Sequence, residues 1–233
     1  MTRLQLPLAL NPPRRPSFDN FVAGPNRVVV ATLNGGVAVG EWCFLAGPPG
    51  SGRSHLLAAF FAERCRQGEQ AHFVALKKPR QHLLLEHATG HWVVLDDIDQ
   101  LAGDPEGEQA LFNALNRWRA ERTGVLMSGA GRAAFALPDL RSRLGQATRL
   151  TLKPLEEPEL GELVRKLAAE HEVVLGRGVV EYSLSRAPRN PGCLAELIQT
   201  GAQRALVERR TLSVPLVRDL LNEGVAQRRS NAL

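Results

Sequence analysis

The stretch Gly47-Pro48-Pro49-Gly50-Ser51-Gly52-Arg53-Ser54 decides the fold of this chain. An apolar run at 42–46 precedes it and predicts a buried strand, and apolar side chains at helical spacing follow it over 55–65. A strand, a turn with the pattern G-x-x-x-x-G-[K/R]-[S/T] and a helix together indicate a phosphate-binding loop. The backbone N–H groups of such a loop and the N-terminus of its helix point at an anion.

All eight loop residues are therefore candidate nucleotide ligands, and the Ser54 hydroxyl would bind Mg²⁺. Arg53 departs from the usual pattern, because a lysine normally stands there and reaches the β- and γ-phosphates. Arginine keeps the charge but replaces a compact ammonium by a wider planar fork. We therefore expect a bound ADP or ATP with Mg²⁺, and at most weak ATP hydrolysis by this chain alone. A glycine-rich turn without a ligand is disfavoured, because both flanking elements are present.

A second apolar run, 92–95, delivers two carboxylates, Asp96 and Asp97, to the end of a predicted strand. Unpaired buried charges are costly, so such acids need a partner. Mg²⁺ is one: Asp96 would hold the hydration shell of the ion, and Asp97 would orient or deprotonate an attacking water. The alternative is that both acids cap the next helix. Beside a phosphate loop, we favour the metal.

Three further positions have two interpretations each. Phe18 and Phe21 lie upstream of the loop and either cover an adenine ring or pack the edge of the domain. Ser128 ends another apolar strand and either contacts the γ-phosphate or the attacking water, or only begins a turn. Arg143 projects from an amphipathic segment, 138–144, and is either a solvated side chain or an arginine finger acting on the triphosphate of a neighbouring molecule.

Composition narrows the class of protein. The net charge is +5 and the pI about 9.6, but the basic residues are scattered, so we expect weak non-specific DNA contact at most. The three cysteines are far apart, which suits a reducing cytoplasm and argues against a disulfide framework and a zinc site. No apolar run is long enough to span a bilayer, so we expect no membrane association.

The pattern along the chain predicts an α/β fold. Strand candidates alternate with helices as far as residue 152, which implies a parallel sheet of five strands, and only helices follow. We predict a flexible arm at 1–16, a nucleotide-binding domain at 17–153 and a small α-helical lid domain at 154–233. The predicted strands are 42–46, 72–76, 92–96, 124–128 and 148–152. The predicted helices are 54–66, 106–120, 156–170, 178–187, 192–208 and 213–224.

These pieces resemble AAA+ ATPases and, within that group, the DnaA initiator family. The segment 17–22 followed by Gly24 and Asn26 is similar to the start of the DnaA nucleotide domain, 96–98 to its Walker B segment and 142–144 to its arginine-finger segment. The resemblance implies that the strand carrying Ser128 lies between the two motif strands, which favours a sensor role for this serine. It stops where DnaA continues into a DNA-binding domain, so we expect no DNA-reading head in this chain.

The arm contains Gln5-Leu6-Pro7-Leu8-Ala9-Leu10, which is similar to the Q-L-x-L-x-L peptide that docks replication proteins onto the sliding clamp. An extended peptide can place its leucines in an apolar pocket while the glutamine bonds at the rim. Together with Arg53, this peptide resembles the DnaA-related regulatory inactivators, the Hda family. That resemblance implies a negative regulator of replication initiation, which binds ADP, sits on the clamp and presents Arg143 to ATP-bound DnaA.

Two departures from the family remove charged groups from the nucleotide pocket of this chain, which argues against ATP hydrolysis by the chain itself. The sensor arginine expected near Gly192 is absent unless Arg189 replaces it, and 128–131 lacks the usual acid after the strand. An autonomous ATPase, such as a helicase loader or a transposition helper, is the main alternative. A P-loop kinase ranks last, because the segment after Pro154 offers no acceptor site. Whether the protein forms a homo-oligomer stays open.

Overall fold

The computed structural model describes residues 15–78, 80–131 and 133–230. The chain divides into two compact units, one comprising Pro16–Pro154 and the other including Leu155–Leu233. None of the described helices is long and apolar enough to cross a membrane.

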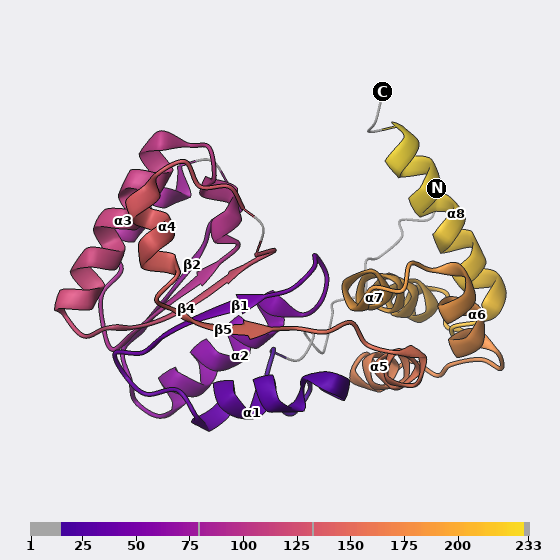
Figure 1. Cartoon of the computed structure of the whole chain (residues 1–233). Coiled ribbons are helices and arrows are strands. Elements are labelled where there is room, and N and C mark those ends of the chain that lie inside the picture. Colours follow the sequence, from indigo (N-terminus) through magenta and orange to yellow (C-terminus); the bar gives the residue numbers. More distant parts are fainter. Residues whose placement is uncertain (1–14, 79, 132, 231–233) are drawn as a thin grey trace. The chain divides into compact units, whose positions relative to one another are not determined.

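The first unit is built on a five-stranded parallel sheet, as the alternating pattern predicted (Figure 1). The strand order is β2-β3-β4-β1-β5, so β4 lies between the strands that precede the phosphate loop and the paired acids, as the resemblance implied. The strands are β1 Trp42–Ala46, β2 Ala71–Ala75, β3 Trp92–Asp96, β4 Gly124–Gly129 and β5 Thr148–Thr151.

Alternate side chains of the central strands point to opposite faces of the sheet, and helices cover both faces. On one face, α3 (Pro105–Ala120) and α4 (Pro138–Leu144) pack on a core that includes Phe44, Val93 and Met127. On the other, α1 (Arg27–Gly35) and α2 (Arg53–Arg66) pack on a core that includes Leu45, Val94 and Leu126. Burial on both faces explains why these strands are continuous apolar runs.

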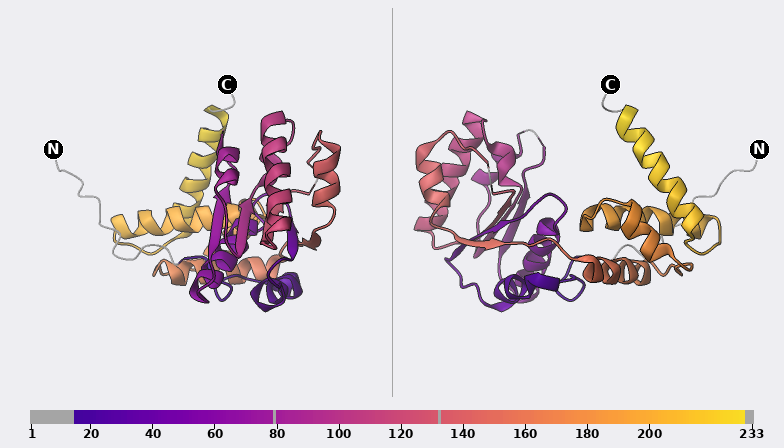
Figure 2. Two further views of the ribbon diagram at one scale, coloured as in Figure 1. Left: turned by 90° about the vertical axis from the view of Figure 1, so that its left-hand side faces the viewer. Right: turned by 45° about the vertical axis from the view of Figure 1, so that its right-hand side comes forward.

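Among its described residues, the second unit contains only helices apart from one isolated bridge between Leu175 and Leu212. Their apolar faces share a core that includes Val164, Ile198 and Val217. Figure 2 shows these helices from two further directions. They are α5 Glu157–Glu170, α6 Val179–Arg186, α7 Pro191–Val207 and α8 Val214–Ser230.

The predicted elements are present, with ends that differ by one residue in most cases. Helix α8 extends six residues beyond the predicted end at 224. The sequence interpretation missed α1 because Val28, Val29 and Val30 suggest a strand, although they lie in a helix. It also missed the 3₁₀ turns η1 Gly24–Asn26, η2 Gln81–Glu86 and η3 Ile98–Leu101.

Asn26 connects the two ends of the first unit. Its side chain is buried, and it donates from Nδ2 to the Lys153 carbonyl at 3.0 Å and accepts from the Lys153 N–H at 2.7 Å. Asn26 belongs to the segment that is similar to the start of the DnaA nucleotide domain, and its side chain therefore fixes the backbone of a residue 127 positions further along the chain.

Glu108 is a buried carboxylate that fixes the loop leading to α4. It accepts backbone N–H bonds from Gly103 at 2.8 Å, Ala136 at 2.9 Å and Leu137 at 2.7 Å. Burial alone would raise the pKa of Glu108, but these donors and the nearby Arg141 guanidinium outweigh it and hold the pKa below its usual value.

We predict that Glu108→Ala lowers the free energy of unfolding of the first unit by about 3 kcal/mol, because three N–H groups lose their acceptor. Since the folded pKa is depressed, this contribution is present above the unfolded pKa and disappears as the pH falls through the folded one. Urea denaturation followed by tryptophan fluorescence measures it, because Trp42, Trp92 and Trp118 all lie in this unit. The exposed Glu106 provides a control: if Glu106→Ala costs as much, the assignment is wrong.

Candidate phosphate and metal site

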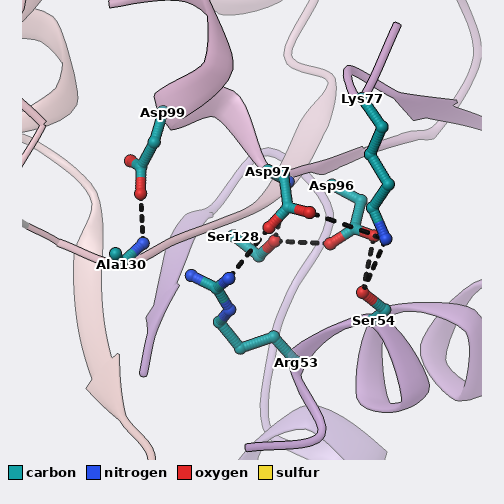
Figure 3. A network of polar contacts seen from close by, with 8 residues as sticks. All are labelled: Arg53, Ser54, Lys77, Asp96, Asp97, Asp99, Ser128 and Ala130. Atoms are coloured by element: carbon teal, nitrogen blue, oxygen red, sulfur yellow. Dashed lines mark hydrogen bonds and ion pairs between the residues drawn. The ribbon is translucent and has the colours of Figure 1, made fainter. Parts of the chain in front are cut away.

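The polar residues of the site gather where parallel strands end at one edge of the sheet. The phosphate loop follows β1 and Lys77 follows β2. Asp96 ends β3, Asp97 comes directly after it, and Ser128 lies in β4 (Figure 3). In open α/β sheets this edge is where ligands bind. The structure thus brings together predicted residues that are far apart in sequence.

Two glycines shape the backbone of the loop. Gly52 has φ +95°, and a Cβ there would lie 2.6 Å from the Phe21 ring. At Gly47 a Cβ would lie 2.6 Å from Ser51 Oγ. Within the loop, the Ser51 N–H donates to the Pro48 carbonyl at 3.2 Å. A side chain at position 52 would therefore meet both backbone strain and the Phe21 ring, and one at position 47 would force Ser51 to move, so glycine suits both positions of the loop.

Arg53 is the first residue of α2 and bonds across the site to Asp97, with Nη2 and Oδ1 2.9 Å apart. Its other terminal nitrogen, Nη1, is buried and has no hydrogen-bond partner, and the same is true of Ser51 Oγ. Buried polar atoms without partners are rare and costly. An anionic ligand in the loop would supply the missing acceptors.

Asp96 is almost fully buried and is held by two hydroxyl groups. Ser54 Oγ donates to its Oδ2 and Ser128 Oγ to its Oδ1, each at 2.7 Å. Ser128 in turn accepts the Asp97 N–H at 3.0 Å. The serine therefore contacts both acids of the pair and does more than begin the turn after β4.

Asp97 has a left-handed backbone with φ +59° and precedes η3. It occupies the N-cap position, but its side chain makes no capping hydrogen bond. The carboxylate instead faces Arg53 and the Lys77 ammonium, whose Nζ lies 3.5 Å from Asp97 Oδ2. The alternative that Asp97 caps the next helix through its side chain is therefore wrong.

Lys77 contacts three oxygens of the site. Its Nζ lies 3.3 Å from Asp96 Oδ2 and 3.4 Å from Ser54 Oγ, in addition to Asp97. Partial burial would lower the pKa of Lys77, but the two carboxylates outweigh it and raise the pKa above its ordinary value. The sequence interpretation missed this residue, although its place directly after a predicted strand put it at the same edge of the sheet.

The chemistry of the site fits a magnesium ion held together with a nucleotide. Ser54 and Asp96 place a hydroxyl and a carboxylate side by side, and Mg²⁺ prefers such oxygens together with phosphate. Among the described residues, no group of three or more His, Cys, Asp or Glu side chains could hold a metal without such help. Mg²⁺ would neutralise charge on the phosphates.

Asp99 is a second residue that the sequence interpretation missed. Its carboxylate accepts the Ala130 N–H, and a Cβ at Gly129 would collide with it. The loop after β4 lacks its own acid, as predicted, but Asp99 provides one from η3. Its place three residues after Asp96 is the only signal in the sequence.

Phe18 and Phe21 both pack against the core under α1 and α2. The Phe21 ring also lies 5.5 Å from the His55 ring, centroid to centroid, beside the phosphate loop. Packing thus accounts for both side chains, and contact of either with an adenine ring remains a prediction.

Arg143 lies in the last turn of α4 and is partly exposed. Its side chain makes no hydrogen bond or ion pair with any residue in the described part of the chain. By contrast, Arg141 on the same helix donates to the Phe135 carbonyl at 2.9 Å. Of these two arginines, Arg143 is therefore the one whose guanidinium makes no polar contact within the described part of the chain.

The remaining predicted residues lie elsewhere. Gln5, Leu6, Leu8 and Leu10 are outside the described residues. In the second unit, Gly192 lies in the first turn of α7, and Arg189 pairs with Glu157 at 3.2 Å.

No protein-family model matches the chain, but solved structures do. Domain III of the replication initiation protein DnaA from Thermotoga maritima is 16% identical with a TM-score of 0.76, over 91% of this chain and 98% of that one. AMPPCP-bound DnaA from Aquifex aeolicus is 18% identical with a TM-score of 0.64, over 85% of this chain and 66% of that one.

The Thermotoga maritima RuvB Holliday junction branch migration motor is also similar. It is 21% identical with a TM-score of 0.65, over 90% of this chain and 72% of that one. At such identities the likeness concerns the fold. The predicted α/β fold class is confirmed: the chain shares the fold of DnaA domain III and of RuvB, with a five-stranded parallel sheet covered by helices.

Proposed function

We propose that this chain is a cytoplasmic, nucleotide-held adaptor of the Hda type that represses replication initiation. It binds ADP or ATP with Mg²⁺ in the phosphate loop and docks on the sliding clamp through Gln5, Leu6, Leu8 and Leu10. It then presents Arg143 to DnaA, which hydrolyses its ATP. On this proposal the helical unit is the lid of the nucleotide site.

The observation that carries the proposal is the phosphate loop, with its buried unpartnered Arg53 Nη1 and Ser51 Oγ. These atoms favour an anionic ligand. The Arg53–Asp97 ion pair favours an adaptor over a motor, because it engages the carboxylate that would orient or deprotonate the attacking water. The AMPPCP named for the similar DnaA structure fits a nucleotide at this edge of the sheet.

We predict that Arg53→Ala weakens ADP binding roughly 10- to 100-fold, the range expected for one charge-assisted hydrogen bond to a phosphate. Isothermal titration calorimetry measures the affinity. Arg66→Ala, at the other end of α2 with an exposed side chain, is the control and should bind as the wild type does. Wild-type affinity in Arg53→Ala would contradict a phosphate contact.

We predict that Gln5→Ala combined with Leu8→Ala abolishes retention by immobilised sliding clamp and leaves the ADP affinity unchanged. The substitutions remove the rim hydrogen bond and one apolar anchor of the docking peptide. Asn11→Ala, in the same arm but outside the peptide, is the control. Equal loss of clamp and nucleotide binding would refute separate sites, and retention of DnaA together with the wild type on the clamp would support the adaptor.

An autonomous ATPase is the second candidate, and the convergence of Ser54, Asp96 and Ser128 favours it. The two candidates differ in turnover. An autonomous enzyme hydrolyses ATP steadily when it is purified alone. The adaptor alone binds nucleotide without steady hydrolysis, and it stimulates hydrolysis only of the ATP that is bound to DnaA.

A further inference from the structure

We propose that the Lys77 ammonium is a built-in cation on the oxygens that would hold the metal, so that nucleotide binding depends only weakly on Mg²⁺. The inference rests on the proposed nucleotide site and concerns a residue to which that proposal assigns no part. It predicts a property of the site that can be measured without any catalysis.

The first support is geometric. Lys77 Nζ approaches Ser54 Oγ at 3.4 Å, Asp96 Oδ2 at 3.3 Å and Asp97 Oδ2 at 3.5 Å (Figure 3). Ser54 and Asp96 are the residues with which this fold would hold Mg²⁺ beside the phosphates. One amine therefore contacts both expected metal ligands and the second acid of the pair.

The second support is the balance of charge. A phosphate entering the site meets the two carboxylates of Asp96 and Asp97, and like charges close together repel strongly where water is excluded. Arg53 can compensate only one of them. Lys77 supplies the second positive charge, which a divalent ion would otherwise have to bring.

The third support is the difference in exposure between the two side chains, because that of Asp96 is buried and that of Lys77 is about half exposed. The Asp96 side chain is 3% exposed and that of Lys77 is 52% exposed, so the ammonium reaches inward from a solvated stem. An ion pair between two exposed side chains would contribute little. Here the carboxylate is sheltered, and the flexible lysine can also withdraw when Mg²⁺ arrives. Lysine and metal are thus alternatives on the same oxygens.

The test is the ADP affinity of the full chain, measured by titration calorimetry in excess MgCl₂ and in EDTA. We expect the wild type to change by less than about threefold, and Lys77→Met to lose roughly tenfold in EDTA and recover with Mg²⁺, as expected for one charged contact. Lys78→Met, which removes the neighbouring exposed amine, should follow the wild type. Lys77→Arg keeps the charge and should stay close to the wild type in EDTA.

The outcomes separate this inference from the proposed function. Wild-type affinity that collapses in EDTA, or equal losses in Lys77→Arg and Lys77→Met, would overturn the role of Lys77 while leaving the nucleotide site in place. Absence of ADP binding by the wild type under both conditions would overturn the nucleotide site and, with it, this inference. Thermal unfolding by circular dichroism shows that each variant is folded.

Discussion

On the proposed adaptor function, replacing Arg143 by alanine is expected to reduce the hydrolysis of DnaA-bound ATP to the rate of DnaA alone, with clamp and ADP binding unchanged. An arginine supplied in trans to a transferring phosphoryl group is worth roughly 10³-fold or more in rate, so its loss removes essentially all stimulation. The side chain makes no polar contact within the described part of the chain, so its removal should not disturb the fold.

The measurement is a single-round assay with radiolabelled ATP on DnaA, with clamp loaded on DNA and the adaptor added last. Ser142→Ala, an exposed neighbour on the same helix, should stimulate as the wild type does. Arg143→Lys keeps the charge but loses the planar fork and should recover only a small part of the rate. Full stimulation by Arg143→Ala would remove this residue from the mechanism.

Gly52→Ala will cost the first unit about 2–5 kcal/mol in free energy of unfolding, the sum of left-handed backbone strain and a collision in the core. The residue has φ +95°, and the new Cβ would lie 2.6 Å from Phe21 Cε2. Relief requires the ring or the loop to move, so ADP affinity should fall as well. Urea denaturation and calorimetric titration measure the two effects.

Gly68 separates strain from collision. It lies just beyond the other end of α2 with φ +81°, and a Cβ there would meet nothing within 4 Å. Gly68→Ala should therefore cost only the strain, about 1–2 kcal/mol. If Gly52→Ala lowers the free energy of unfolding no more than Gly68→Ala does, the Phe21 ring moves aside without cost and the collision contributes nothing.

The parts of the site that follow one strand could be predicted from the sequence, because each is a local pattern. The phosphate loop is a contiguous glycine-rich turn between two recognisable elements, and Asp96 and Asp97 end a conspicuous apolar run. The carboxyl-edge rule for parallel sheets then places them together before any coordinates are known.

The pairings across the site could not be predicted, because they join residues far apart in sequence. Arg53 meets Asp97 across 44 positions, and Lys77 meets Ser54 across 23. The same edge rule should have flagged Lys77, since it follows a predicted strand. The pair Lys77-Lys78 belongs to no recognisable motif, however, so the sequence did not indicate which residues Lys77 contacts.

Glu108 shows a different reason for failure. A glutamate in a predicted helix normally indicates a solvated face. Its buried position follows from backbone donors at Gly103, Ala136 and Leu137, in two loops that only the folded chain brings together. Every residue type except proline has a backbone N–H group, so hydrogen bonds to the backbone cannot be recognised from residue identities as side-chain motifs can.

The hydrogen bonds between Asn26 and the Lys153 backbone have a practical consequence for dissecting the protein. They hold Lys153, next to the end of the α/β segment, against Asn26, which lies near its beginning, so in a gene fragment covering Pro16–Pro154 the two ends of the chain would stay close together. Segments that enter and leave a fold at one point are those that tolerate excision, circular permutation or grafting into a host loop. We expect this fragment to express alone.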